Sequence, residues 1–467
     1  MSGHNLESMF SPRSIAVIGA AREHMKMGNA TLLNVLVHGF EGKIYPINPK
    51  ADTIMGLKCY PSVLDVPDEI DLAIIVIPAK YVPGVMEDCA KKGIKSVIII
   101  SAGFGEIGGE GKVLEDKVLE IARRSGIRVI GPNTMGYKSP VDNLDASFVF
   151  GMAYPGDIAL ASQSGALAIG MIAHANMEMI GLSRIISVGN KIDVDDAELI
   201  EYLDSDDKTK VITMYIEGIK DGRRFFEAAK KSSKPIVVIK SGRTKAGAAA
   251  AKTHTGSLSG SDVVYNSIFR QAGIHRARDA TQLFDFARAL ANLPLPKGRN
   301  VGIVTNGGGA GILMSDFCEM KGLNIVQPSE ETKVKLREIL PSISVPRNPV
   351  DVIGDAGFFR YYASAKALLE DPDVDGVIVI SVHGGYARPR EFVGAILKLY
   401  EDMKEGAVPE KPVIVCWVGG KEYSDVVFDL KIKGIPAYPT TERAAAAMNV
   451  LVEEHERRER MRGPESS

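Results

Sequence analysis

The chain has 467 residues, of which 45% are hydrophobic and 24% are charged, proportions typical of a globular protein that buries its core without disulfides or structural metal ions. Its formal net charge of −2 disfavours nucleic acid as the main partner, and no apolar run approaches the ~18 residues of a membrane span. The four cysteines lack metal-ligand spacing and the chain opens without a signal-peptide pattern, so we expect a reduced, cytoplasmic protein with no metal site of its own.

The first 145 residues alternate short apolar segments with amphipathic, helix-like stretches. This alternation predicts a parallel sheet covered by helices on both faces. Open α/β sheets of this kind bind ligands in the loops that follow the carboxyl ends of their strands. We expect strands at residues 14–19, 44–47, 72–77, 96–100 and 128–130.

Gly19 ends the first of these strands, and Gly28 follows nine positions later, with Lys26 between them. The spacing differs from GxGxxG, so the dinucleotide-binding fingerprint is absent. The two glycines still allow the backbone to approach a nucleotide phosphate, and Lys26 adds a positive charge nearby. An ordinary glycine-rich connection between strand and helix is the alternative interpretation.

The same order of strand, turn and helix recurs twice more, which predicts three consecutive α/β domains. A linker at residues 291–298 separates the second block from the third. Strands are expected at residues 158–161, 185–188, 211–216 and 235–240 in the second block, and at 300–305, 377–381 and 413–418 in the third.

A short turn rich in small residues follows the first strand of each of these two blocks. Ser162-Gln-Ser-Gly-Ala166 precedes a helix expected from residue 167, and Asn306-Gly-Gly-Gly-Ala-Gly311 precedes one expected from residue 312. Unpaired amides and the helix dipole create an anion site at such a junction. Each turn alone is equally well explained as a tight connection, whereas the pair suggests two sites for a phosphoryl group.

His254 lies within residues 242–260, a run dominated by glycine, alanine, serine and threonine in which nothing is large enough to bury an imidazole. Small side chains make few contacts, so we expect a mobile loop whose histidine can carry a group between two sites. A solvated loop histidine is the simpler interpretation. Glu217, just past a predicted strand, can orient the imidazole through a hydrogen bond to one ring nitrogen, although it too can be a solvated loop residue. Asp351 and His383, also at strand ends, are weaker candidates.

With these residues assembled, the chain resembles the α subunits of ADP-forming acyl-CoA (acetyl-CoA) synthetases, which are relatives of succinyl-CoA synthetase. The resemblance covers nearly the whole length. It implies a Rossmann-like CoA-binding domain at residues 1–145, followed by two flavodoxin-like domains at 146–292 and 293–467. The segments that carry it are 14–19, 45–50, 77–79, 101–106, 131–136, 162–166, 215–218, 252–256 and 306–311.

The resemblance also implies roles for single residues. His254 would be phosphorylated, with Glu217 aligning and stabilising its ring. Phosphate would be held first by Ser162, Gln163, Ser164 and Gly165, and after movement of the histidine by Gly307, Gly308, Gly309, Ala310 and Gly311. Coenzyme A would be bound by Gly19, Ala20, Lys26, Gly28, Asn48, Lys50, Pro78, Ser101, Ala102, Gly103, Phe104 and Asn133.

The reaction implied by the resemblance turns acyl-CoA, phosphate and ADP into a carboxylic acid, CoA and ATP. The chain contains no Walker-type phosphate loop, and its three blocks leave no room for a nucleotide-grasping domain. We therefore expect ADP or ATP, with Mg²⁺, to bind a separate β subunit in an α2β2 heterotetramer. A non-catalytic, CoA-binding regulatory protein is the first alternative, and a nicotinamide-dependent oxidoreductase built on the first block is the second.

Overall fold

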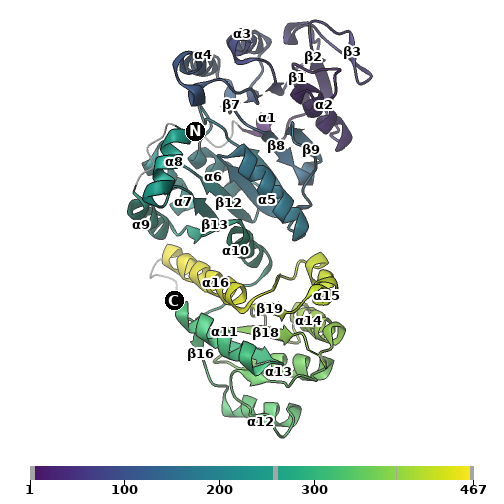
Figure 1. Ribbon diagram of the computed structural model, residues 1–467, viewed down its shortest axis with the longest axis vertical. Coiled ribbons are helices and arrows are strands. Elements are labelled where there is room, and N and C mark those ends of the chain that lie inside the picture. Colours follow the sequence, from purple (N-terminus) through teal and green to yellow (C-terminus); the bar gives the residue numbers. More distant parts are fainter. Residues whose placement is uncertain (1–5, 256–260, 385, 463–467) are drawn as a thin grey trace. The chain divides into compact units, whose positions relative to one another are not determined.

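The computed structural model describes residues 6–255, 261–384 and 386–462, apart from the side chains of 251–255, 421–424 and 426. The chain divides into two compact units, Met1–Leu283 and Phe284–Ser467. Two large sheets lie in the first unit and one lies in the second (Figure 1). Among the described residues, no helix combines the length and the apolar character needed to cross a membrane.

The first sheet has five parallel strands in the order β2-β1-β5-β6-β7. Every residue of β1, β5 and β6 is buried, as expected for a parallel sheet covered on both faces. The order changes direction between β1 and β5, and the loops at this switch point are the expected place for a ligand. The bounds are β1 Ser14–Ile18, β2 Lys43–Ile47, β5 Leu72–Ile75, β6 Ser96–Ile99, β7 Arg128–Ile130, α2 Met27–Val37, α3 Val82–Lys92 and α4 Gly109–Ser125.

The second and third sheets repeat this parallel order. Their five-stranded parts run β11-β10-β12-β13-β14 and β16-β15-β18-β19-β20, which is the flavodoxin-like order 2-1-3-4-5 in both cases. The second sheet contains β10 Pro155–Ser162, β11 Leu182–Ser187, β12 Val211–Ile216, β13 Ile236–Lys240 and β14 His275–Ala277, with α5 Gly165–Met177, α6 Asp196–Ser205, α7 Gly222–Lys231, α8 Lys245–Thr255 and α9 Asp262–Ala272. The third contains β15 Asn300–Thr305, β16 Asn324–Ile325, β18 Gly376–Val382, β19 Val413–Val418 and β20 Ala437–Tyr438, with α11 Gly308–Met320, α12 Glu330–Ile339, α13 Phe358–Glu370, α14 Pro389–Lys404, α15 Lys421–Ile432 and α16 Thr441–Arg462.

These sheets confirm the predicted class of three α/β domains, with the last two flavodoxin-like. Every predicted strand is present, with bounds shifted by a few residues at most. The apolar runs predict these strands well, because a strand that is buried on both faces has a continuous run of Val, Ile and Leu rather than alternating apolar and polar residues.

A β-hairpin that the sequence analysis missed joins the second sheet. β8 (Gly136–Ser139) and β9 (Leu144–Ser147) pair with each other, and β8 runs antiparallel beside β11. The hairpin crosses the domain boundary expected at residue 145. Because its hydrogen bonds belong to the second sheet, we propose that the second domain begins at Gly136.

The helix α10 (Ala280–Asn292) crosses the boundary between the two compact units. Its C-terminal part binds within the second unit, where Asp285 forms a salt bridge of 2.7 Å with Arg443 and its carbonyl oxygen accepts a hydrogen bond of 3.0 Å from Tyr438. We therefore propose that the third domain begins within this helix rather than at residue 293.

The prediction of a loop over residues 242–260 is wrong for most of that segment, because Lys245–Thr255 form the helix α8. Alanine has the highest helix propensity of any residue, and four alanines in succession outweigh Gly247, the one glycine within the helix. Thr244 supports the start of the helix, because its hydroxyl oxygen accepts a hydrogen bond of 3.1 Å from the Gly247 amide. The backbone at His254 is helical, and its side chain lies outside the described part of the structure.

Candidate active site

The turn after β10 forms the first turn of α5 at the switch point of the second sheet. The Ser164 hydroxyl oxygen caps the helix by accepting a hydrogen bond of 3.2 Å from the Leu167 amide. The carbonyl oxygen of Ser164 accepts another, of 3.0 Å, from the Ala168 amide. The first two amides of the helix, those of Gly165 and Ala166, have no acceptor within it. They are the donors that this turn can offer to an anion.

Ser162 shapes the turn from inside. Its buried hydroxyl donates to the carbonyl oxygen of Ser164 at 2.8 Å and accepts from the Ser164 amide at 3.2 Å. This hydroxyl is occupied by the turn itself, so we assign Ser162 a structural role beneath the anion position.

Loss of the cap is expected to be measurable. Replacing Ser164 with Ala removes the side-chain acceptor, and we expect the unfolding free energy of the first unit to fall by about 1 kcal/mol. Urea unfolding monitored by circular dichroism checks this. Ser267→Ala serves as a control, because Ser267 lies within α9 and donates to the Val263 carbonyl rather than capping a helix. An equal loss in both variants would contradict the capping role.

Gln163 has no side-chain hydrogen-bonding capacity left for a ligand. Its Oε1 accepts from the backbone amides of Glu217 and Gly218, at 2.8 and 3.1 Å. Its Nε2 donates to the carbonyl oxygen of Gly218 at 2.9 Å and to the Asp196 carboxylate at 3.1 Å. Its backbone amide donates to the Tyr215 carbonyl oxygen at 3.2 Å. The prediction that Gln163 holds phosphate therefore has no support in this geometry, whereas Ala166, which the sequence analysis left out, has a suitably placed amide.

Glu217 follows the last residue of β12, as predicted. Its carboxylate lies near the Tyr215 hydroxyl, whose pKa is raised above its ordinary value mainly by burial and also by Glu217. The next strand of the sheet is β13, and the Ser241 amide just beyond it donates to the carbonyl oxygen of Ile216 at 3.0 Å. The chain runs from there into α8. Glu217 and the segment that carries His254 therefore leave neighbouring strands at the same edge of the sheet.

Lys240, the last residue of β13, is a buried cation at this edge that the sequence analysis missed. Its Nζ donates to the Ser241 carbonyl oxygen at 2.5 Å and lies 4.5 Å from the ring centroid of Tyr265. Burial lowers the pKa of this amine, and the charge of Glu217 acts in the opposite direction. The edge thus combines helix amides, a carboxylate and a lysine, a set suited to holding and transferring a phosphoryl group.

The turn after β15 in the third domain is built in the same way. The Thr305 hydroxyl donates to the Gly307 carbonyl oxygen at 3.0 Å and accepts from the Gly307 amide at 3.1 Å, which reproduces the bonds of Ser162. The helix α11 begins at Gly308, earlier than predicted, and the amides of Ala310 and Gly311 donate back to Gly307. Of the five residues expected to hold phosphate here, only Gly308 and Gly309 keep amides without an acceptor in the helix.

The two weaker candidates of the third domain differ in position. Asp351 lies beside this turn, since a Cβ placed on Gly308 would be 3.5 Å from its Oδ2. A carboxylate there opposes binding of a bare anion. The His383 amide donates to the Val418 carbonyl oxygen at 2.7 Å, which ties the residue to β19 at the carboxyl edge of the sheet.

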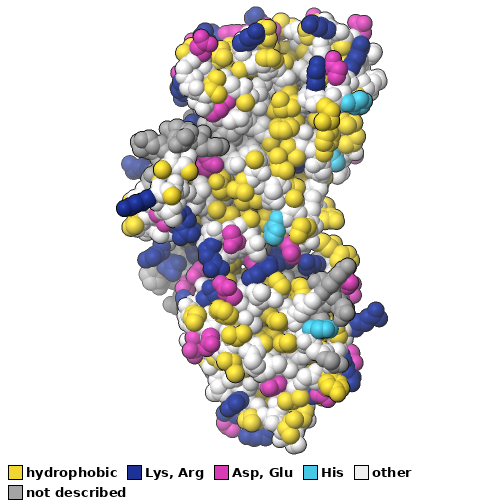
Figure 2. Space-filling model, viewed as in Figure 1, with side chains coloured by type: hydrophobic (Ala, Val, Ile, Leu, Met, Phe, Trp, Pro, Cys, Tyr) yellow, Lys and Arg dark blue, Asp and Glu magenta, His cyan; other side chains and the backbone are white. Residues whose placement is uncertain are grey.

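The helix α5 exposes apolar side chains near both of its ends. Leu167, Ile169 and Met177 are exposed along it. Figure 2 shows hydrophobic side chains gathered on the surface where α5 lies in Figure 1. A group of exposed apolar side chains on a protein surface often marks a site of contact with another protein.

A pocket of about 470 Å³ opens at the switch point of the first sheet. Gly19, Asn48, Lys50 and Pro78, all predicted site residues, are among its lining residues. The Asn48 amide donates to the carbonyl oxygen of Ala20 at 2.7 Å, so this side chain fixes the loop after β1. The pocket therefore has the position that an open α/β sheet gives to its ligand.

Gly19 and Gly28 are required by packing. Gly19 has a φ of +94°, and a Cβ on Gly28 would lie 2.0 Å from the Gly19 carbonyl oxygen. The start of α2 thus presses directly against the turn after β1. Lys26 is mostly exposed, forms an ion pair with Glu23 and precedes the first turn of α2.

The remaining predicted residues of the first domain form the neighbouring loops after β6 and β7. The Ser101 hydroxyl accepts from the Ile77 amide at 3.1 Å, and the Asn133 amide donates to the Ser101 carbonyl oxygen at 2.9 Å. Ala102 and Gly103 lie between Ser101 and the fully buried Phe104. These residues are close to the pocket in the fold and shape its surroundings, but they are not among its lining residues.

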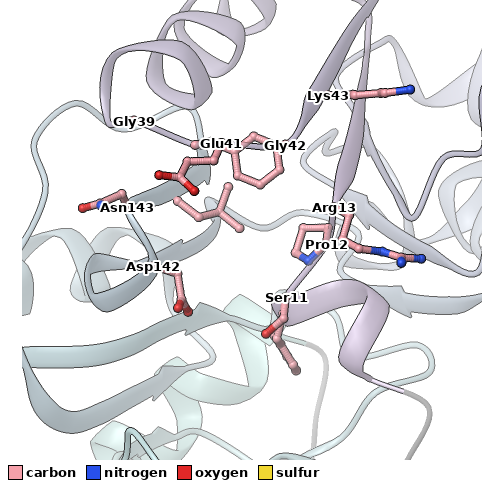
Figure 3. A pocket seen from close by; sticks show the side chains of 12 residues that line it. Ser11, Pro12, Arg13, Gly39, Glu41, Gly42, Lys43, Asp142 and Asn143 are labelled. Atoms are coloured by element: carbon pink, nitrogen blue, oxygen red, sulfur yellow. The ribbon is translucent and has the colours of Figure 1, made fainter.

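A second pocket, of about 630 Å³, lies at the opposite edge of the same sheet (Figure 3). Its lining includes the residues that precede β1 and β2, so it opens at the amino ends of these strands. The cationic ends of Arg13 and Lys43 point away from it in Figure 3, toward their ion-pair partners Asp71 and Asp68. This pocket lacks the helix amides that favour a phosphate-bearing ligand, and we do not place the site there.

Comparisons with known proteins match three successive parts of the chain to three families. Residues 13–140 match the family described as CoA binding domain, residues 155–290 match the succinyl-CoA ligase like flavodoxin domain, and residues 301–456 match the ligase-CoA domain. The chain is 45% identical to acetate–CoA ligase [ADP-forming] I subunit alpha of Pyrococcus furiosus, over 96% of this chain and 97% of the relative. It is 42% identical to acetate–CoA ligase [ADP-forming] of Methanocaldococcus jannaschii, of which it spans 63%.

A solved structure is similar over the whole chain. It is that of dinucleotide forming acetyl-coenzyme A synthetase 1 of Ca. Korarchaeum cryptofilum, in complex with phosphate and ADP. The TM-score is 0.93 at 41% sequence identity, and the alignment covers 99% of each chain.

Proposed function

The chain belongs to the family of α subunits of ADP-forming acyl-CoA synthetases, and we propose that it acts through a phosphohistidine at His254. The overall reaction would convert acyl-CoA, phosphate and ADP reversibly into a carboxylic acid, CoA and ATP. The observation that carries this proposal is the arrangement at one edge of the second sheet. Glu217, the turn with the amides of Gly165 and Ala166, and the segment leading to His254 follow three neighbouring strands there. The names of the relatives favour acetate as the acid.

The reaction proceeds in three balanced steps in this proposal. Phosphate, held by the Gly165 and Ala166 amides, attacks the thioester carbonyl and releases CoA, which leaves an acyl phosphate. An imidazole nitrogen of His254 then attacks the phosphorus, and the carboxylate departs. Finally the phosphoryl group passes from His254 to ADP. The amides stabilise the anionic phosphoryl oxygens, and the Glu217 carboxylate orients the imidazole and balances its positive charge.

Coenzyme A is assigned to the pocket at the switch point of the first sheet. The match of residues 13–140 to the CoA binding domain supports this, as does the presence of Gly19, Asn48, Lys50 and Pro78 in the lining. The same match disfavours a nicotinamide-dependent oxidoreductase. A purely regulatory CoA-binding protein is disfavoured by the relatives, which are named as ligases over the same length.

A substitution at Gly28 tests this assignment. A Cβ at this position would collide with the Gly19 carbonyl oxygen and push α2 away from the turn, so we expect Gly28→Ala to weaken CoA binding at least tenfold and to destabilise the first unit by about 1–3 kcal/mol. Titration calorimetry with CoA measures the affinity. Gly84→Ala in α3 is the matched control, because a Cβ there meets no atom within 4 Å. Unchanged affinity in Gly28→Ala would contradict the assignment.

The nucleotide and its Mg²⁺ are assigned to a partner subunit. Relatives named as α subunits are covered almost completely by this chain, whereas it spans only 63% of the longer Methanocaldococcus jannaschii relative. We propose that the partner corresponds to the remainder of that longer chain and contacts the exposed apolar side chains of α5. An α2β2 assembly is the stoichiometry we expect.

The turn at Gly308 and Gly309 is proposed as a second phosphoryl site. Its two amides repeat the arrangement at Gly165 and Ala166. Asp351 beside it means that a phosphoryl group there needs a compensating positive charge, which a protonated phosphohistidine ring or a cation would supply.

Reconstitution tests the proposed function as a whole. Mixing the full-length chain with its partner subunit, acetyl-CoA, phosphate, ADP and Mg²⁺ is expected to yield ATP, measured by a luciferase assay, in amounts equal to the CoA released. Either subunit alone should give none. ATP formation by this chain alone would contradict the assignment of the nucleotide to a partner, and its absence from the complete mixture with a panel of acyl-CoAs would contradict the reaction.

A further inference from the structure

Two side chains, those of Gln163 and Lys191, bind the backbone of Glu217 and Gly218, and a third, that of Asp196, binds both of these side chains. Gln163 binds both of their amides and the Gly218 carbonyl oxygen. The ammonium of Lys191 binds the same carbonyl oxygen at 2.8 Å. The carboxylate of Asp196, the first residue of α6, accepts a hydrogen bond from the Lys191 ammonium at 2.7 Å and another from the side-chain amide of Gln163 at 3.1 Å. The cluster is therefore closed, and every connection ends on the segment that carries the Glu217 carboxylate.

The two charged members of the cluster are buried. The exposed fractions of their side chains are 7% for Lys191 and 5% for Asp196. Removing two charges from water offsets most of their mutual attraction, so such a pair contributes little net stability. The pair instead fixes positions. The lysine binds the Gly218 carbonyl oxygen, and the aspartate binds the side-chain amide of Gln163, and each of these groups would otherwise be free to shift.

The third domain offers an internal comparison. Ser162 is in register with Tyr215, and Thr305 with Ile380, so Val382 occupies the position that Glu217 has in the second domain. The side chain of Asn306 bridges the Val382 backbone, donating to its carbonyl oxygen at 3.0 Å and accepting from its amide at 2.7 Å. In the third domain, the uncharged side-chain amide of Asn306 is thus sufficient to hold the backbone at Val382. The lysine–aspartate pair accompanies the turn that presents a carboxylate.

We propose that Lys191 and Asp196 are positioning residues, which act through Gln163 to hold the Glu217 carboxylate at the distance from His254 that phosphoryl transfer requires. This inference rests on the proposed function. It assigns to the reaction two residues whose side chains lie behind the site, where no substrate atom need contact them.

The experiment measures single-turnover phosphorylation of the full-length chain by acetyl-CoA and radiolabelled phosphate, at a temperature well below the unfolding midpoint of every variant. We expect Lys191→Met and Asp196→Asn to lower the maximal rate about 10–100-fold, the cost of a misplacement near 1 Å. The acetyl-CoA concentration at half-maximal rate should change less than twofold. Asp196→Asn preserves side-chain volume and so keeps the test available if Lys191→Met folds poorly.

Two comparisons separate positioning from general destabilisation. In a Glu217→Gln background, Lys191→Met should lower the rate less than twofold further, because residues that act through one group are not additive. Lys138→Met, which breaks another buried lysine–aspartate pair of the same unit, should leave the rate within twofold of wild type. The inference would be overturned if the effects of Lys191→Met and Glu217→Gln were fully additive, or if Lys191→Met and Asp196→Asn both reacted at the wild-type rate. In either case, phosphorylation of the wild-type protein would still support the proposed function. Unlabelled wild-type protein, with the partner and an acyl-CoA panel present, would overturn both.

Discussion

Replacing Glu217 with Gln is expected to slow phosphorylation of His254 by about 10²–10³-fold, the range found when one group that stabilises developing charge at the reacting centre is lost. Glutamine keeps the size and the hydrogen-bonding shape of the side chain, but it removes the charge that stabilises a positive imidazole. The backbone bonds to Gln163 remain, since they involve the Glu217 amide rather than its carboxylate. Affinity for CoA should not change.

Rapid-quench incorporation of labelled phosphate measures this effect. Glu227→Gln is a suitable control, because Glu227 is an exposed residue of α7 in the same domain. Equal rates for Glu217→Gln and Glu227→Gln would remove Glu217 from the mechanism and leave the carboxylate as a solvated strand-end residue.

The second large effect concerns stability. Asp145 forms a fully buried salt bridge with Lys138, whose ammonium also donates to the carbonyl oxygens of Val149 and Gly151, at 2.7 and 2.9 Å. Burial raises the pKa of Asp145 and lowers that of Lys138, so the charge of each depends on the other. Asp145→Ala leaves an uncompensated buried lysine, and we expect the unfolding free energy of the first unit to fall by about 3–5 kcal/mol.

Urea unfolding followed by fluorescence and circular dichroism checks this value. The control is Asp157→Ala, since Asp157 pairs with Lys210, a mostly exposed lysine at the surface, and its loss should cost less than about 1 kcal/mol. Similar midpoints for the two variants would show that the hairpin does not depend on the buried pair.

Much of the fold is predictable because its strands are short apolar runs that end in turns of small residues. The runs at 158–161 and 300–305 predict strands, and the turns after them predict helix starts. Asp145 and Lys138 lie in a hairpin that the sequence analysis missed, because its residues are polar and mixed rather than apolar. A polar strand is stabilised here by a buried ion pair, which no periodicity reports.

The candidate site is predictable in part. Glu217 and the turn after β10 follow from their places at strand ends, and the structure puts both at one edge of the sheet. The position of Gln163 beneath Glu217, and the contacts of Lys191 and Asp196 with Gly218 and Gln163, involve residues 27 to 55 positions apart in the chain. Such contacts arise from the order of the strands, and a single sequence carries no local signal for them. The helix α8 differs from the predicted mobile loop for another reason: small residues make few contacts, but a run of alanines also favours a helix.

Intact mass of the purified chain after incubation with acetyl-CoA and phosphate tests the central claim most directly, beside a His254→Ala variant treated in the same way. The account predicts a gain of one phosphoryl group, about 80 Da, that is lost in acid and absent from the variant, as expected for the nucleophile of covalent catalysis. Equal phosphate in wild type and His254→Ala would contradict it, because phosphorylation would then lie on another residue. An unchanged mass in both, with the partner subunit and other acyl-CoAs present, would contradict the phosphohistidine mechanism altogether.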